Sequence, residues 1–226
     1  MKIASRICVL PLFVILFMAF AGADIFAAEE PPSWKDLDIE VLAKLLEDGE
    51  LTSVDYVGPE KLEMCSIGIL ADAPPEKVWE AITDFAGYEE MMPDMSKGTV
   101  LESGDNWARV RFDITVLKLS LISITTDYVL RYDFDPPRRA DVSWESGKVK
   151  NVNGYWELFP IDGGKRTVVI YAITSDLESA NALAGAALKK QPSMVMAINL
   201  SSAIVLTRVV KQKAERLAGE EAENNG

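Results

Sequence analysis

Hydrophobic and polar residues alternate along the middle of the chain, a pattern typical of half-buried β-strands. The clearest case begins at Trp107 and runs to Val116, where every second residue is apolar. Similar patterns and the turns between them predict further strands at about 51–57, 61–70, 97–102, 119–134, 140–145, 152–158 and 167–173. The segment 167–173 is apolar on both faces, so we expect it to be covered on both sides.

Two segments in the first half of the chain have a helical period. Residues 37–46 and 75–85 carry apolar side chains at three- and four-residue spacing, which predicts amphipathic helices. Pro74 and Pro75 suit the start of the second helix, where a missing N–H costs nothing. A further short helix is expected after Gly87.

The final third of the chain is also helical in pattern. It predicts a helix at 179–191 and a long helix that restarts at Pro192 and runs to about Leu217. Residues 191–207 carry no charge, which fits a helix buried on most of its circumference, with a membrane span as the alternative. We expect the helix to break at Gly219 and residues 219–226 to form a disordered acidic tail.

The first residues have the pattern of a targeting signal. Lys2 and Arg6 precede an uncharged apolar run at 7–23, which ends in the small residues Ala21-Gly22-Ala23. We therefore expect a signal peptide at 1–23 and an exported, periplasmic protein. An uncleaved N-terminal anchor is the alternative, although the run is slightly short of the roughly 20 apolar residues that span a bilayer.

The rest of the chain divides simply. Residues 24–50 are expected to form a linker and the N-terminal helix, 51–218 a single domain, and 219–226 the tail. Removal of 1–23 takes away two basic residues and no acidic one, so the net charge falls from −12 to −14. Such a charge repels phosphate backbones and disfavours a nucleic-acid partner.

The composition also restricts the chemistry. The chain has no histidine, which excludes Ser-His-Asp and Cys-His catalysis and histidine metal sites. Cys65 is the one cysteine left after cleavage, so no intramolecular disulfide can form, and we interpret it as a buried hydrophobic residue. We predict no catalytic residues, no cofactor and no metal, and no calcium-loop motif is present.

One stretch, Ala71 to Asp94, resembles a known family. Its sequence, ADAPPEKVWEAITDFAGYEEMMPD, is similar to the opening of the START/Bet v 1-like (SRPBCC, helix-grip) superfamily, nearest its coenzyme Q-binding and polyketide cyclase-like bacterial branch. The resemblance covers roughly residues 51–217. It implies an α+β helix-grip fold, in which a curved antiparallel sheet wraps around the long C-terminal helix and two short helices follow the first main strand.

The resemblance further implies a ligand cavity between the sheet and the long helix. Taking the inward side of each alternating strand and one face of the helix, we expect it to be lined by Met91, Met95, Phe112, Tyr128, Tyr132, Trp144, Trp156, Met194, Ile198, Asn199 and Val205. For each residue taken alone, ordinary core packing is the alternative.

Three arginines fall on the opposite side of the strands. We expect Arg109, Arg111 and Arg131 to lie on a solvated outer face, paired with nearby aspartates. A one-residue bulge would reverse the faces and turn these arginines into anchors for an anionic ligand.

The leading hypothesis is an exported carrier or chaperone for a hydrophobic small molecule such as a lipid, quinone or polyketide-like compound. It would be monomeric and could make transient contact with a membrane. One alternative is a cyclase/aromatase-like or hydrolytic enzyme that uses the same cavity. Another is an interaction module whose core is filled by side chains.

Overall fold

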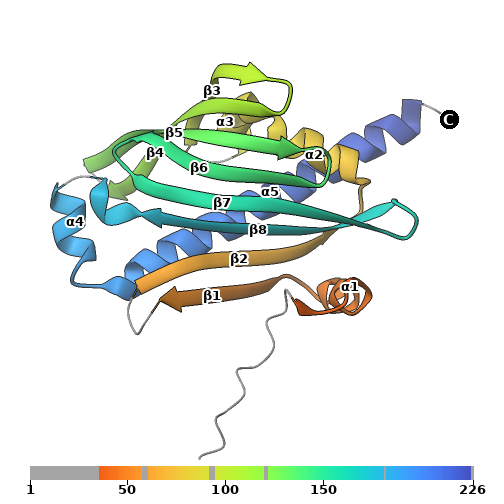
Figure 1. The fold of residues 1–226 in the computed structure, drawn as a ribbon, viewed down its shortest axis with the longest axis horizontal. Helices are drawn as coiled ribbons and strands as arrows, with labels where there is room; N and C mark the ends of the chain where they lie inside the picture. Colours follow the sequence, from red (N-terminus) through yellow and green to blue (C-terminus); the bar gives the residue numbers. More distant parts are fainter. Residues whose placement is uncertain (1–35, 58–60, 92–94, 120–121, 181, 225–226) are drawn as a thin grey trace, which may run out of the picture. The chain divides into compact units, whose positions relative to one another are not determined.

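The computed structural model describes residues 36–57, 61–91, 95–119, 122–180 and 182–224 (Figure 1). The predicted signal peptide and its alternative, an N-terminal anchor, lie outside these residues. The elements in chain order are α1 (Ile39–Glu47), β1 (Leu51–Val57), β2 (Lys61–Ala71), α2 (Pro75–Thr83), a 3-10 turn (Phe85–Gly87), α3 (Tyr88–Met91), β3 (Met95–Gly104), β4 (Trp107–Leu119), β5 (Ile122–Asp135), β6 (Arg139–Gly147), β7 (Lys150–Ile161), β8 (Arg166–Asp176), a 3-10 turn (Leu177–Ser179), α4 (Ala182–Leu188) and α5 (Pro192–Asn224).

The strands form one eight-stranded sheet in the order β1-β2-β8-β7-β6-β5-β4-β3, with every neighbouring pair antiparallel. β2 and β8, far apart in sequence, pair with Ile67 opposite Tyr171. The curved sheet wraps around α5, which runs along one of its faces (Figure 1). The predicted α+β architecture is therefore confirmed.

The main core lies between this inner sheet face and helices α2 and α5. Alternation places Ala108, Val110 and Phe112 of β4 inward, and all three are buried. From the helices, Val78 of α2 and Val210 of α5 are fully buried in the same core. The amphipathic spacing of α2 thus faces the sheet as the sequence predicts.

The opposite face of the sheet carries a second apolar cluster beneath α1. Leu42 and Leu46 of α1 pack with Leu70 of β2 and with Val168 and Ile170 of β8. Side chains of β8 therefore point alternately into the main core and under α1. This explains why the segment 167–173 is apolar on both faces, as the sequence indicates.

Helix α5 differs from the sequence prediction at its end. It continues through Gly219 to Asn224, so the expected disordered tail is wrong for 219–224. A single glycine inside a helix costs only about 1 kcal/mol, too little to stop one whose flanking residues favour helix. Arg216 and Glu220 also form an i,i+4 ion pair of 2.6 Å across this point.

The apolar first half of α5 is also less buried than expected. Among the described residues, Ser193–Asn224 is the one helix that is long and apolar enough to cross a membrane, a test that the core helix of a soluble protein also passes. Its most apolar window has a mean hydropathy of 1.6, and 22% of that window is buried. The helix therefore contacts the sheet along one face and leaves the other exposed.

Candidate functional site

A cavity of ≈120 Å³ lies between the inner face of the sheet and the first half of α5, and we call it the inner cavity. Strands β4 to β8 form its sheet side, and α5 forms the other wall. Its lining residues are Tyr88, Phe112, Tyr128, Leu130, Tyr132, Val142, Val149, Val152, Tyr171, Ile173, Ser175, Leu177, Asn199, Ser202, Ala203 and Leu206.

The structure brings some of the predicted site residues together at this cavity. Four line it, namely Phe112, Tyr128, Tyr132 and Asn199. Three others pack against the main core outside the lining, namely Trp144, Trp156 and Ile198. The side chains of Met91 and Met95 lie outside the described part of the structure.

Met194 and Val205 do not line the cavity, so their prediction as site residues is corrected. Their side chains are 46% and 40% exposed, on the side of α5 that faces away from the sheet. Met194 and Val205 were expected at the cavity because they are large and apolar, which is not what marks the sheet-facing side of this helix. The phase that faces the sheet is instead marked by small and polar residues, with Asn199, Ala203 and Thr207 buried at four-residue spacing.

Other lining residues come from places where the sequence pattern carries little signal. Val149 lies in the turn between β6 and β7, and Leu177 lies just beyond the end of β8. Neither belongs to a regular alternation. Ser175 could have been found, because a polar residue inside a buried apolar run needs a partner.

Ser175 and Asn199 bond to each other across the cavity wall. The hydroxyl of Ser175 donates to Oδ1 of Asn199 at 2.7 Å, which links β8 to α5. The Nδ2 group of Asn199 donates to the carbonyl oxygen of Val195 at 3.0 Å. These two bonds give a partner to both the oxygen and the nitrogen of the amide, and the first of them fixes α5 against the sheet at this point.

Four tyrosines face the same space, and they differ in how their hydroxyls are used. The hydroxyl of Tyr88 donates to the carbonyl oxygen of Ile82 at 2.6 Å. Within the described part of the chain, the hydroxyls of Tyr128, Tyr132 and Tyr171 donate no hydrogen bond. Tyr171 stacks on Trp156, with ring centroids 4.0 Å apart.

Burial raises the pKa of all four phenols above the ordinary value of 10.0. For Tyr132, the neighbouring phenols of Tyr88, Tyr171 and Tyr128 raise the pKa further. Each phenol therefore stays neutral and keeps its proton at physiological pH. The cavity contains hydrogen-bond donors, and none of the described residues that line it is charged.

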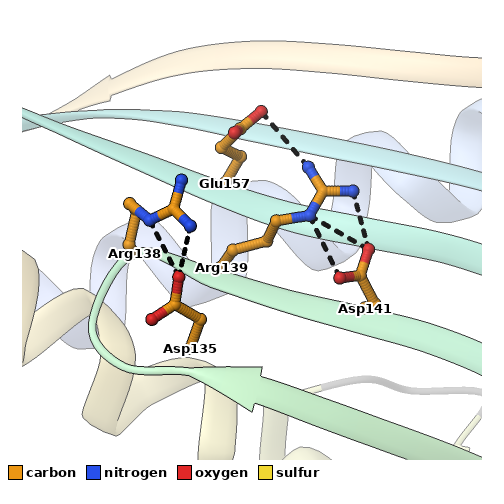
Figure 2. Close-up of polar contacts among 5 residues, drawn as sticks. All are labelled: Asp135, Arg138, Arg139, Asp141 and Glu157. Carbon is orange, nitrogen blue, oxygen red and sulfur yellow. Dashed lines mark hydrogen bonds and ion pairs between the residues drawn. The ribbon is translucent and has the colours of Figure 1, made fainter.

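The three arginines in question lie on the outer face, as the sequence predicts. Arg109 pairs with Glu145 at 2.7 Å, Arg111 with Asp127 at 3.2 Å, and Arg131 with Asp133 at 2.8 Å. Figure 2 shows the same kind of pairing further along, where Arg139 of β6 meets Asp141 at 2.6 Å and Glu157 of β7 at 3.5 Å. These arginines therefore form ion pairs on the outer surface of the sheet and do not reach the cavity.

A larger depression of ≈520 Å³ lies on the surface between α2 and α5. Charged side chains dominate it, and an ion pair between Asp84 and Lys213 crosses it. This ion pair ties the turn after α2 to α5. The depression is larger than the inner cavity, but its lining suits an apolar ligand less well.

Cys65 is buried and stays in its thiol form. Burial, with a smaller contribution from Asp55, raises the pKa of Cys65 to about 11, so its thiol stays protonated at neutral pH. Among the residues that the structure describes, no group of three His, Cys, Asp or Glu side chains could hold a metal ion.

Solved structures share this fold. A protein from Thermus thermophilus is 16% identical, with a TM-score of 0.57 over 69% of this chain and 99% of the other. The Zhui aromatase/cyclase from Streptomyces sp. R1128 is 22% identical, with a TM-score of 0.50 over 68% of this chain and 94% of the other. A START superfamily protein from Mycobacterium smegmatis is 14% identical, with a TM-score of 0.51 over 68% of this chain and 98% of the other.

Sequence comparison gives the family directly. No curated protein sequence is significantly similar to this chain. The profile of one family, described as polyketide cyclase/dehydrase and lipid transport, matches residues 67–214. That match spans the strands and helices that build the inner cavity, from β2 to α5. The chain therefore belongs to the polyketide cyclase/dehydrase and lipid transport family.

Proposed function

We propose that this protein is an exported carrier or chaperone that holds a hydrophobic small molecule, such as a lipid, quinone or polyketide-like compound, in the inner cavity. The observation that carries the proposal is a cavity between the sheet and α5 whose lining, as far as the structure describes it, contains no charged side chain. An apolar ligand gains free energy by leaving water for such a site. A charged ligand would lose its hydration without finding a counter-ion.

Family membership supports the same interpretation. The family description names lipid transport beside polyketide cyclases and dehydrases, and both kinds of protein take ligands with large apolar surfaces. The pattern of residues 1–23 supports export, which would place the carrier where lipids and quinones must cross an aqueous space.

The size of the cavity limits what can enter without a structural change. Its volume of ≈120 Å³ is below the roughly 300–1,000 Å³ of pockets for drug-sized ligands. Ser202 of α5 is the exposed residue of the lining, so we place the entrance beside it. A whole lipid can enter only if α5 moves away from the sheet. Otherwise the hydrocarbon chain of the lipid stays outside the cavity, beyond Ser202.

Native mass spectrometry tests this function. The full chain is expressed in a bacterium, and the chain from residue 24 is purified from the periplasm. We expect a stoichiometric adduct that is released by organic solvent and identified in the extract. Ser202→Trp would block the entrance and reduce the adduct severalfold. Ser201→Trp is the matched control, because Ser201 is also exposed and is not part of the lining.

Other outcomes would reject the carrier. A protein that is free of ligand and takes up neither lipids nor quinones from a panel would contradict it. The same spectra would then favour an interaction module, or an enzyme with a water-soluble substrate if added compounds are converted. A chain that stays in the cytoplasm with residues 1–23 attached would contradict export while leaving the binding test intact.

A further inference from the structure

The inner cavity contains more hydrogen-bonding capacity than an apolar ligand needs. Tyr132 and Tyr171 line it with 5% and 6% of their surface exposed, and Tyr128 joins them from β5. Within the described residues, none of these three hydroxyls donates a hydrogen bond. These hydroxyls are therefore free to donate to an acceptor that enters the cavity, which would offset the cost of leaving them without a partner.

Most other polar groups of the described lining have partners. Tyr88 donates to Ile82, and Asn199 bonds to Ser175 and Val195. Ser202 of α5 is exposed and lies beside the entrance. The three phenol hydroxyls without a partner among the described residues all come from the sheet side, from β5 and β8.

We propose that the inner cavity selects an uncharged, ring-bearing ligand whose carbonyl or ether oxygens accept hydrogen bonds from Tyr132 and Tyr171, assisted by Tyr128. This inference rests on the proposed function and adds the chemical class of the ligand. It favours ketone-, quinone- or lactone-like head groups and rejects ionised head groups such as carboxylates and phosphates.

Three properties of the site set this class. The phenols are neutral hydrogen-bond donors, so they match an acceptor oxygen on the ligand. They carry no negative charge that would pair with a cation. The described residues of the lining include no arginine or lysine to neutralise an anion. The volume of ≈120 Å³ is close to the about 150 Å³ of a cavity known to hold a single benzene ring, so a ring fits and a bulky head group does not.

Three probes of similar size separate the contributions. Cyclohexanone carries the acceptor oxygen, methylenecyclohexane replaces C=O by C=CH₂ in the same shape, and cyclohexanecarboxylate carries a charge. Titrations followed by methyl NMR would use Val142, Val149 and Leu206 as reporters of the cavity. Val168, which lies under α1 on the other face of the sheet, is the methyl group that should not shift.

We expect cyclohexanone to bind roughly tenfold more tightly than methylenecyclohexane, as one or two hydrogen bonds to otherwise unpaired donors would give. Cyclohexanecarboxylate should not shift the cavity methyl groups. Tyr132→Phe and Tyr171→Phe should each lower the cyclohexanone preference, and the double variant should bring it close to one. Each variant should still bind methylenecyclohexane, which shows that the cavity is intact.

Tyr155→Phe is the matched control, because it removes a phenol hydroxyl from the outer face of β7, beside Arg139. Its cyclohexanone preference should equal that of the wild type. Equal binding of cyclohexanone and methylenecyclohexane, a preference that survives the double variant, or tightest binding of the carboxylate would each overturn the inference while leaving the proposed function standing. Failure of all three probes to shift the cavity methyl groups would overturn both.

Discussion

Asn199 shows how one polar side chain sets the orientation of a long helix. It is 4% exposed, and its amide bonds to Ser175 on β8 and to the backbone of its own helix. Rotating α5 by one residue would bury a large apolar side chain in its place and leave Ser175 without this partner. The hydrogen bond therefore selects the small-residue face of α5 for the cavity wall.

Gly98 allows another close approach at residue scale. A Cβ there would lie 2.3 Å from the carbonyl oxygen of Phe85 and 2.9 Å from a ring carbon of Phe112. We predict that Gly98→Ala lowers the free energy of unfolding by about 1–3 kcal/mol, measured by urea denaturation. Gly219→Ala is the control. Its Cβ would meet nothing within 4 Å, so stability should rise by up to about 1 kcal/mol. Equal effects of the two variants would contradict this account.

The ion pair between Asp84 and Lys213 predicts a pH dependence. The hydrogen bond from Lys213 lowers the pKa of Asp84 below its ordinary value of 3.8, against a smaller opposing effect of burial. The unfolded chain therefore binds this proton more readily than the folded one. The stabilisation is present above about pH 4 and is lost as the pH falls through the folded pKa.

Asp84→Asn tests this sign. The variant should be less stable than the wild type at pH 7 by about 0.5–1 kcal/mol, a modest figure because Asp84 is half-exposed. The difference should shrink as urea unfolding is repeated from pH 5 down to pH 3. A difference that is constant over this range would show that the charge of Asp84 does not contribute.

At the scale of elements, α1 stabilises the sheet without touching the cavity. Leu46 is buried against β2 and β8, whereas Leu45 beside it is 46% exposed. We predict that Leu46→Ala costs about 2–4 kcal/mol of unfolding free energy and that Leu45→Ala costs less than about 0.5 kcal/mol. Neither should change binding of a cavity ligand, which the same methyl NMR titration measures. Weaker binding in a fully folded Leu46→Ala variant would show that α1 and the cavity are coupled.

The elements also show what a single sequence can and cannot supply. Alternation located the strands well, because a strand with one buried face repeats every two residues and a slip would expose its whole core side. The sheet-facing side of α5 was predicted only in part. Asn199 was named, but Ala203 and Thr207 were not, because hydrophobicity does not mark such small or polar residues. Val149 and Leu177 reach the cavity from turns, and only the pairing of distant strands brings them there.

At the scale of the whole molecule, charged side chains keep the outer face of the sheet hydrated. Acidic residues exceed basic ones over the chain, yet on the outer face arginines alternate with carboxylates across β4, β5 and β6. Single exposed pairs of this kind contribute little stability. Together they give an eight-stranded sheet an outer face that does not favour stacking on another sheet.

The pairing of β2 with β8 decides when the cavity can come into existence. Ile67 can meet Tyr171 only after most of the domain has been synthesised, and α5, the opposite wall, comes later still. Pairing of such distant segments is slow because a long loop must close first. A growing chain therefore has no binding site to offer. Ligand binding can therefore begin only after the chain has been synthesised through α5.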